Sequence, residues 1–266
     1  MKIALQAFTL RNYRGRPASV GYKESIKTML RRVKDIGYDG IEMGTPEGFT
    51  LMEYKEYMDE IGLQVATASV PGILDKDDLS GAIEQCKVLG SKNIMIGAMP
   101  PVVLGNPWEL EVFIEKLNRV GAALIAEGIH LSYHNHAVDF AKINGKTLFE
   151  QLVDGTDKNS VFFEPDTHWL QAGGAHVITW LKKLKGRMYM VHFKDYGIDP
   201  YSDHAFLEGT HKLFMEVGEG NLNWPGIIAE CKEQGIEWCA VEQDVCQRPA
   251  YEAIEISLKN LRKFGA

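Results

Sequence analysis

Four short stretches of the sequence place histidines and carboxylates directly after runs of apolar residues. The stretches are residues 131–136 (LSYHNH), 161–168 (VFFEPDTH), 190–195 (MVHFKD) and 240–244 (AVEQD). If residues 131–136 form a strand, His134 and His136 project to the same face, because side chains alternate along a strand. Imidazole and carboxylate groups at the ends of four successive strands predict one shared site that could bind a metal ion or move a proton.

The expected chemistry follows from these two kinds of ligand. Imidazole nitrogen and carboxylate oxygen together suit Mn²⁺, Co²⁺, Zn²⁺ or Fe²⁺, whereas Mg²⁺ fits less well because it prefers oxygen ligands alone. Two histidines and two carboxylates would leave room for substrate oxygens around one divalent metal ion. Such an ion, held by a hydroxy-ketone, can polarise the carbonyl and stabilise an enediolate, which makes the proton on the adjacent carbon removable.

The elements that must position these residues alternate between strands and helices along the whole chain. Strands are expected at residues 3–8, 40–43, 64–69, 93–97, 131–135, 161–166, 188–193 and 238–242. Helices are expected at residues 22–36, 78–89, 106–127, 147–153, 177–184, 224–234 and 250–263, with one more that opens at Thr50. Eight such units predict an α/β fold, a single-domain (β/α)8 TIM barrel over residues 1–266, whose catalytic groups lie where the strands end.

Two local patterns mark helix starts, and one argues against a different fold. Thr50 and Glu53 match a capping box, and Asn106 before Pro107 supplies an N-cap and a proline at the first helical position. A doubly wound sheet is the competing fold. It usually has a glycine-rich turn after the first strand, whereas residues 9–12 read TLRN.

The polar stretch at residues 195–221 is long for a loop inside a compact domain, and it contains several glycines and a proline. Loops of this length are usually functional. We therefore expect this stretch to be a mobile lid over the mouth of the barrel.

Composition argues against several other classes of protein. A formal net charge of −7 argues against a nucleic-acid-binding surface, which would normally be basic. The four cysteines show no CxxC spacing, which is typical of reduced thiols in a cytosolic protein. The first residues, MKIALQ, lack the apolar region of a signal peptide, and no run approaches membrane-spanning length. We expect a cytoplasmic protein that binds neither nucleic acid nor a membrane.

The motifs together resemble those of a known family. The sequence is similar to the xylose isomerase-like TIM-barrel superfamily of sugar (phosphate) isomerases and epimerases, which also contains hydroxypyruvate isomerases, inosose dehydratases and endonuclease IV. The resemblance covers the whole chain, and its sharpest parts are YHNH at 133–136, EPDT at 164–167, VHFKD at 191–195 and VEQD at 241–244. In this order the motifs are fairly specific for the superfamily and unspecific for the substrate.

The resemblance implies a single metal ion held by one residue from each of the last four strands. The matching positions are His134, Asp166, His192 and Glu242. His134 stands where many members of the family have Glu, and an imidazole can bind a metal ion but cannot repeat the carboxylate's role unchanged. Glu242 is then the expected catalytic base, with His136 as a second catalytic group.

Other residues near these strand ends are expected to serve the substrate. Lys194 is predicted as a catalytic residue that binds a substrate hydroxyl or phosphate, although it could instead form a local ion pair with Asp195. Glu164, His168 and Trp169 are predicted to bind substrate. Glu164 could instead be a second base or a deeper ion-pair partner, and His168 could instead cap the following helix.

The leading function is a metal-dependent isomerase or epimerase that moves protons on a small keto or aldo sugar or sugar phosphate. A dehydratase or lyase acting on a 3-keto sugar or inosose is the alternative within the same chemistry, and a non-catalytic sugar-binding barrel is the alternative outside it. Endonuclease IV activity is not expected, because the resemblance would then imply extra histidines on strands three and four, which end at Ser69 and Gly97. The expected partner is a small carbohydrate, with a homo-oligomer as the usual assembly of the family.

Overall fold

Eight parallel strands form the centre of the molecule in the computed structural model, which describes residues 1–17, 19–199 and 212–266. The strands are β1 (Lys2–Gln6), β2 (Gly40–Glu42), β3 (Gln64–Thr67), β4 (Asn93–Ile96), β5 (His130–His134), β8 (Val161–Glu164), β9 (Met190–Phe193) and β12 (Trp238–Val241). They are hydrogen-bonded in the orders β3-β2-β1-β12-β9 and β4-β5-β8. Isolated parallel bridges join the two sheets, from Ala68 to Ile94 and from Asp166 to His192. The predicted TIM barrel is confirmed, and each of these strands overlaps its predicted range.

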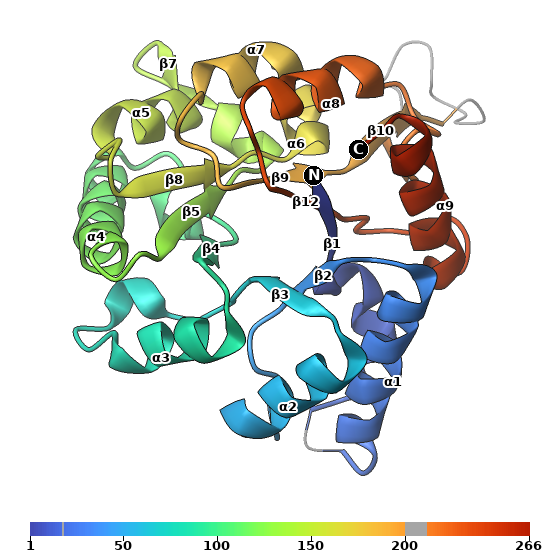
Figure 1. Ribbon diagram of the computed structural model, residues 1–266. Helices are drawn as coiled ribbons and strands as arrows, with labels where there is room; N and C mark the ends of the chain where they lie inside the picture. The colour runs from blue at the N-terminus through green and yellow to red at the C-terminus, as the bar shows by residue number, and fades with distance from the viewer. Residues whose placement is uncertain (18, 200–211) are drawn as a thin grey trace.

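Helices surround the strands on the outside (Figure 1). Those of the described residues are α1 (Tyr22–Ile36), α2 (Leu51–Ile61), α3 (Ser80–Leu89), α4 (Pro107–Ile125), α5 (Leu148–Gly155), α6 (Thr167–Ala172), α7 (Val177–Lys183), α8 (Trp224–Glu233) and α9 (Ala250–Lys263). Only α6 has no counterpart among the predicted helices, because six residues are too few to show a helical period. Within the described part of the chain, no helix combines the length and apolar character needed to cross a membrane.

Shorter elements occupy the connections. They are 3-10 helices at η1 (Ala7–Tyr13), η2 (Ile73–Asp75), η3 (Pro101–Val103) and η4 (Ala137–Phe140), and a small hairpin of β6 (Lys142–Ile143) and β7 (Lys146–Thr147). The predicted helix starts are confirmed. The side chain of Thr50 accepts a hydrogen bond from the backbone N–H of Glu53 (3.1 Å), and the side chain of Asn106 accepts one from Trp108 (3.2 Å). These caps fix where the loops above the strands end.

The interior of the barrel changes from apolar at the N-terminal ends of the strands to charged at the C-terminal ends. A buried cluster of small residues around one large ring lies inside the N-terminal half, and its members are Ala4, Ala66, Met190, Trp238 and Ala240. Gly40 makes room for the ring, since a Cβ at this position would lie 2.8 Å from Trp238. Because alternate residues of a strand face the same side, His192 follows Met190 inward, at the next level of the interior. The apolar cluster around Trp238 thus lies directly below the charged residues at the C-terminal ends of the strands.

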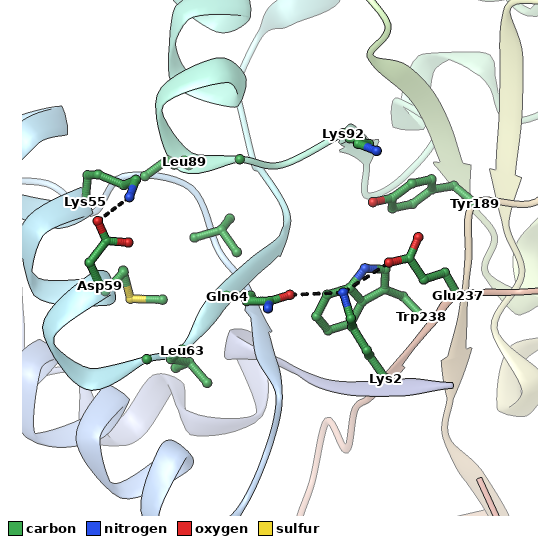
Figure 2. A pocket seen from close by; sticks show the side chains of 14 residues that line it. Lys2, Lys55, Asp59, Leu63, Gln64, Leu89, Lys92, Tyr189, Glu237 and Trp238 are labelled. Carbon is green, nitrogen blue, oxygen red and sulfur yellow. Dashed lines mark hydrogen bonds and ion pairs between the residues drawn. The ribbon is translucent and has the colours of Figure 1, made fainter.

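A pocket of about 480 Å³ lies at the N-terminal end of the barrel (Figure 2). Its charged groups are largely matched: the Nζ of Lys2 lies 3.3 Å from Oε1 of Gln64 and 3.1 Å from Oε1 of Glu237, and Lys55 pairs with Asp59. Catalytic groups of TIM barrels lie at the opposite end, where the strands finish. The functional site is therefore expected at the C-terminal ends of the strands.

The polar stretch at residues 195–221 is more regular than a loop. β10 (Asp195–Ile198) pairs in antiparallel fashion with β11 (Lys212–Met215). Residues 200–211, at the centre of the predicted lid, lie outside the described residues. The prediction of an irregular loop is therefore wrong for the two ends of the stretch, where a β-ribbon forms.

The turn that follows β11 is organised by the buried carboxylate of Asp195. This carboxylate accepts hydrogen bonds from the backbone N–H groups of Gly218 (2.8 Å) and Gly220 (3.1 Å). It also accepts one from the indole Nε1–H of Trp224 (2.5 Å), at the start of α8. A single side chain thus ties the ribbon to the following helix.

Replacing Asp195 by alanine should lower the free energy of unfolding by about 3 kcal/mol, because hydrogen bonds to a charged group contribute roughly 1.5–3 kcal/mol each and those of one network do not add fully. The measurement is chemical denaturation of the purified protein. Glu219→Gln, at an exposed acid of the same turn, is the control and should change that free energy by less than about 0.5 kcal/mol. Equal losses in the two variants would contradict this account of the turn.

Candidate metal centre

Four buried side chains converge at the C-terminal ends of β5, β8, β9 and β12. They are His134, Asp166, His192 and Glu242, and one ligand atom of each lies within 4.8 Å of the others. His134 ends β5 and His192 lies within β9, whereas Glu242 follows β12 directly and Asp166 follows β8 after Pro165. The structure therefore brings together the four residues that the sequence predicts as metal ligands.

Each histidine turns one ring nitrogen toward the centre and the other away from it. His134 Nδ1 lies 3.2 Å from the carbonyl oxygen of Gly97, and its Nε2 lies 3.3 Å from Oδ2 of Asp166. A carbonyl oxygen only accepts hydrogen bonds, so Nδ1 carries a hydrogen, and Nε2 is the ring nitrogen left to bind a metal ion. His192 uses Nδ1 instead, which lies 3.1 Å from Oε2 of Glu242. Both rings are thus oriented as metal ligands.

The two carboxylates of the centre are ionised in spite of their burial. Burial raises the pKa of Asp166, but the Lys194 ammonium and His134 outweigh it and hold that pKa below its usual value. Burial likewise raises the pKa of Glu242, and Lys194 with His192 lowers it well below the usual range. Asp166 divides its oxygens, since Oδ1 caps α6 by accepting a hydrogen bond from the Trp169 backbone N–H (2.7 Å). Its Oδ2 is left for the centre.

A second group of acids holds His192 from the other side. His192 Nε2 lies 3.1 Å from Oε2 of Glu42 and 3.0 Å from Oε1 of Glu164. Gln6 donates a hydrogen bond to Glu42, and Asn93 donates one to Glu164 (3.2 Å). Burial and the neighbouring Glu164 raise the pKa of Glu42 well above its usual value, whereas Glu164, whose burial is opposed by His192, has a lowered pKa. One acid of the pair is therefore neutral and the other ionised.

Lys194 is almost completely buried, and its ammonium is surrounded by carboxylates. Its Nζ lies 2.7 Å from Oδ2 of Asp244, 3.2 Å from Oε2 of Glu242 and 3.5 Å from Oδ2 of Asp166. Burial lowers the pKa of Lys194, but these acids outweigh it and raise the pKa above its ordinary value. The alternative of a local ion pair with Asp195 is wrong, because the Asp195 carboxylate faces the turn after β11.

A pocket of about 550 Å³ opens over the centre, and its lining includes His134, His192, Glu242 and the predicted catalytic residue His136. The ring of His136 lies 4.8 Å from that of His134 and 5.4 Å from that of Trp169. Burial and the neighbouring His134 lower the pKa of His136 to about 4. His136 is therefore a neutral imidazole at physiological pH, placed on the wall of the pocket.

The three predicted substrate-binding residues lie at different depths. Trp169 stands beside His136 at the edge of the centre, with the Lys194 Nζ 4.8 Å from its ring. His168 is buried, its Nδ1 lies 2.7 Å from the carbonyl oxygen of Asp195, and its ring is turned away from the pocket. Glu164 lies beneath His192. None of the three lines the pocket, so their contact with substrate stays a prediction, whereas the contacts of His168 with Asp195 and of Glu164 with His192 support neighbouring groups.

Three residues of the site are absent from the sequence-based prediction. Glu42 ends β2 as the predicted ligands end their strands, so the same strand-end rule could have identified it. Asp244 follows Glu242 by two residues, which is also a usable signal. Arg14, which lines the pocket after η1, has no such signal because it lies in a segment without a predicted period.

The donor set fits a divalent transition-metal ion. Two imidazole nitrogens and two ionised carboxylates suit Mn²⁺, Co²⁺, Zn²⁺ or Fe²⁺ better than Mg²⁺. Burial lowers the pKa of His192, yet Glu42, Glu164 and Glu242 outweigh it and raise that pKa well above 6.5. A metal ion on Nδ1 would displace a proton from this ring, and metal affinity should accordingly rise with pH.

Comparison with known proteins agrees with this geometry. Residues 30–264 match the family model of the xylose isomerase-like TIM barrel. The chain belongs to this family. An inosose dehydratase of Mesomycoplasma hyopneumoniae is 26% identical over 258 residues, which cover 85% of this chain and 83% of the relative.

Solved structures show the same fold. A sugar phosphate isomerase/epimerase from Parabacteroides distasonis superposes with a TM-score of 0.76 at 21% identity, and the match covers 98% of both chains. A 3-keto-D-glucoside 4-epimerase from E. coli superposes with a TM-score of 0.66 at 17% identity over 99% of both chains. At these identities the structural similarity shows the TIM-barrel fold and does not identify the reaction.

We expect the protein to bind about one divalent transition-metal ion per chain and Asp166→Ala to abolish that binding, because a buried ligand oxygen is lost. The measurement is elemental analysis after dialysis against Mn²⁺ or Co²⁺. Asn223→Ala is the matched control, since Asn223 caps α8 as Asp166 caps α6. Each variant should lose about 0.5–2 kcal/mol of stability with its cap. A metal-free wild type, or equal metal contents in the two variants, would show the assignment to be wrong.

Glu164→Gln should weaken metal binding by about 10–100-fold, the usual effect of removing an acid that orients a metal-binding histidine. The carboxylate lies 3.0 Å from His192 Nε2 and does not belong to the predicted ligand set. Competition between the protein and a chelating dye for Co²⁺ measures the affinity. Glu230→Gln, at a buried acid of α8 that pairs with Lys182, is the control and should bind Co²⁺ as the wild type does. Unchanged affinity in Glu164→Gln would contradict the positioning role.

Proposed function

We propose that the protein is a divalent-metal-dependent enzyme that removes a proton next to the carbonyl of a small keto sugar or cyclic keto-polyol. The observation that carries the proposal is the convergence of His134, Asp166, His192 and Glu242 in one cluster, three of which line a pocket together with the neutral ring of His136. The comparisons support it, since the relatives reported above are named as an inosose dehydratase, a sugar phosphate isomerase/epimerase and a 3-keto-D-glucoside 4-epimerase. The cysteines of the described residues are free thiols, which agrees with the proposed cytoplasmic location of a single-domain enzyme.

When bound by His134, Asp166, His192 and Glu242, a divalent ion would supply Lewis acidity toward a substrate carbonyl. The chain's own residues supply the rest. Lys194 keeps a positive charge within 3.5 Å of both Asp166 and Glu242, which offsets their repulsion and fixes their oxygens. Trp169 gives the same region an aromatic side beside His136.

Two side chains of the pocket are candidates for the base. Glu242 is the base expected from the sequence, but its Oε2 is engaged by His192 (3.1 Å) and Lys194 (3.2 Å), and it belongs to the set of predicted metal ligands. His136 is neutral and lines the pocket. We therefore assign proton abstraction to His136 and metal binding to Glu242.

Loss of a β-hydroxyl after proton removal is the outcome that we favour. The electron pair of the broken C–H bond forms a C=C bond, the C–O bond breaks, and His136 returns its proton to the leaving oxygen, which departs as water. A single base suffices for this elimination. The position at which many family members carry a carboxylate is occupied here by His134, whose Nε2 is turned toward Asp166 (3.3 Å). The inosose dehydratase relative is consistent with this choice.

An isomerase or epimerase is the second candidate function. Epimerisation requires one group to remove the proton and another to return it on the opposite face. His136 after β5 and Glu242 after β12 both line the pocket and come from different strands of the barrel. If Glu242 retained enough basicity, these two residues could form such a pair.

His136→Gln should lower the rate of proton removal by about 10²–10⁴, the usual contribution of a general base, without loss of metal. The measurement is mass spectrometry of scyllo-inosose, 3-keto sugars and ketoses after incubation in D₂O with the Mn²⁺- or Co²⁺-loaded protein. Loss of water identifies a dehydratase, and deuterium incorporation without loss of water identifies an isomerase or epimerase. His176→Gln, at an exposed histidine of the α7 start, is the control.

Two other results would contradict the assignment of His136 as the base or the enzymatic function itself. Full activity in His136→Gln together with loss of activity in metal-loaded Glu242→Gln would return the base to Glu242. Neither exchange nor loss of water with any compound would favour the non-catalytic sugar-binding barrel.

A further inference from the structure

The side chain of Arg14, in the lining of the active-site pocket, forms no ion pair with an acid among the described residues. Arg14 lines the same pocket as Glu242 and Asp244. The groups that act electrostatically on its guanidinium are Tyr22, Arg11 and Tyr54, with no carboxylate among them. Its Nε–H is buried and has no hydrogen-bond partner among the residues that the structure describes. Among the described residues, Arg14 is therefore a cation with a buried donor that no other group uses.

The energetics of burial make this arrangement informative. Burial lowers the pKa of Arg14 below its ordinary value, yet a guanidinium stays protonated under all ordinary conditions. A partly buried charge without a counter-ion costs free energy, so proteins normally pair it or reserve it for a ligand. Two lysines of the pocket at the opposite end of the barrel show the ordinary case, since Lys2 pairs with Glu237 and Lys55 with Asp59 (Figure 2).

Two further hydrogen-bonding groups also lack partners among the described residues, one in the lining of the same pocket and one that interacts electrostatically with Arg14. The Oγ1 of Thr45 is buried without a hydrogen bond in the described part of the chain, and Thr45 lines the pocket. The hydroxyl of Tyr54 is fully buried, has no partner there either, and lies close enough to Arg14 to be affected by its positive charge. A guanidinium, a threonine hydroxyl and a phenol can all donate hydrogen bonds.

We propose that Arg14 and Thr45 form an oxyanion subsite, backed by Tyr54, which binds a carboxylate or phosphate group of the substrate. The planar fork of a guanidinium matches the oxygens of both groups. The inference rests on the proposed function and refines it: the substrate is a keto sugar or keto-polyol that bears an anionic group. Glu242 and Asp244, which also line the pocket, repel that group, so its binding to Arg14 would fix the direction in which the substrate lies.

The test compares three non-reacting polyols of similar size, the neutral D-glucitol and the anionic D-gluconate and D-glucitol 6-phosphate. Calorimetric titration of each into the metal-loaded and the chelator-treated protein measures affinity, and the second form removes direct binding of the anion to metal. The wild type should bind at least one anionic polyol about 10–100-fold more tightly than D-glucitol, the effect expected for hydrogen bonds to a charged group. The preferred anion, carboxylate or phosphate, identifies the natural group.

Variants separate the subsite from general charge effects. Arg14→Gln should abolish the preference for the anion while the affinity for D-glucitol stays unchanged, and Arg14→Lys should keep part of it because the charge remains without the fork. Arg16→Gln, at an exposed arginine two residues away, is the control and should behave as the wild type. Thermal unfolding of each variant confirms that the fold is intact.

The failure of this inference is distinguishable from failure of the proposed function. Equal binding of the three polyols, no measurable binding of either anion, or equal losses in Arg14→Gln and Arg16→Gln would overturn the subsite, even if proton exchange on keto sugars were observed. A preference for the anion that depends on Arg14, without any exchange or loss of water, would support the subsite and overturn the enzymatic proposal.

Discussion

The buried imidazole of His192 is the point on which the charged interior depends. Its Nδ1 lies 3.1 Å from Glu242 in the candidate metal centre, and its Nε2 lies 3.1 Å from Glu42 and 3.0 Å from Glu164 beneath it. Buried charges are tolerated only when they are paired, and removal of one partner leaves the others uncompensated. The acids on the two sides of the ring therefore hold it in one orientation, and the ring keeps the two groups of acids apart.

The position of this network follows from the way the barrel is filled. Trp238, accommodated by Gly40 and by small neighbours, fills the interior near the N-terminal ends of the strands. The next inward positions along the strands can then carry charge, because the apolar level below them and the helices outside stabilise the fold. Stability and chemistry are thus separated along the axis of the barrel, as is general for this architecture.

The sequence predicts those parts of the site that are local, and it misses those that depend on contacts between distant segments. His134 and His192 could be identified because each closes a short apolar run, and the N-cap of Asn106 because it precedes a proline. The β10–β11 ribbon could not, since its strands are joined by a polar segment and its turn depends on Asp195, which contacts Gly218 across more than twenty residues. The surroundings of His168 could not be predicted for the same reason, because its ring packs against Phe214 of that ribbon.

The imidazole of His134 affects the charge of the metal centre, and this charge bears on the proposed role of Arg14. A carboxylate at this position, as in many members of the family, would add a third negative charge beside Asp166 and Glu242. An imidazole there instead removes that negative charge, and Lys194 adds a cation at 3.2 Å from Glu242. Negative charge that develops on a substrate oxygen is better stabilised in such an environment, since electrostatic effects are strong where water is excluded. The same positive balance makes an anionic substrate acceptable to a pocket that is otherwise lined with acids, and Arg14 then decides which end of that substrate faces away from the centre.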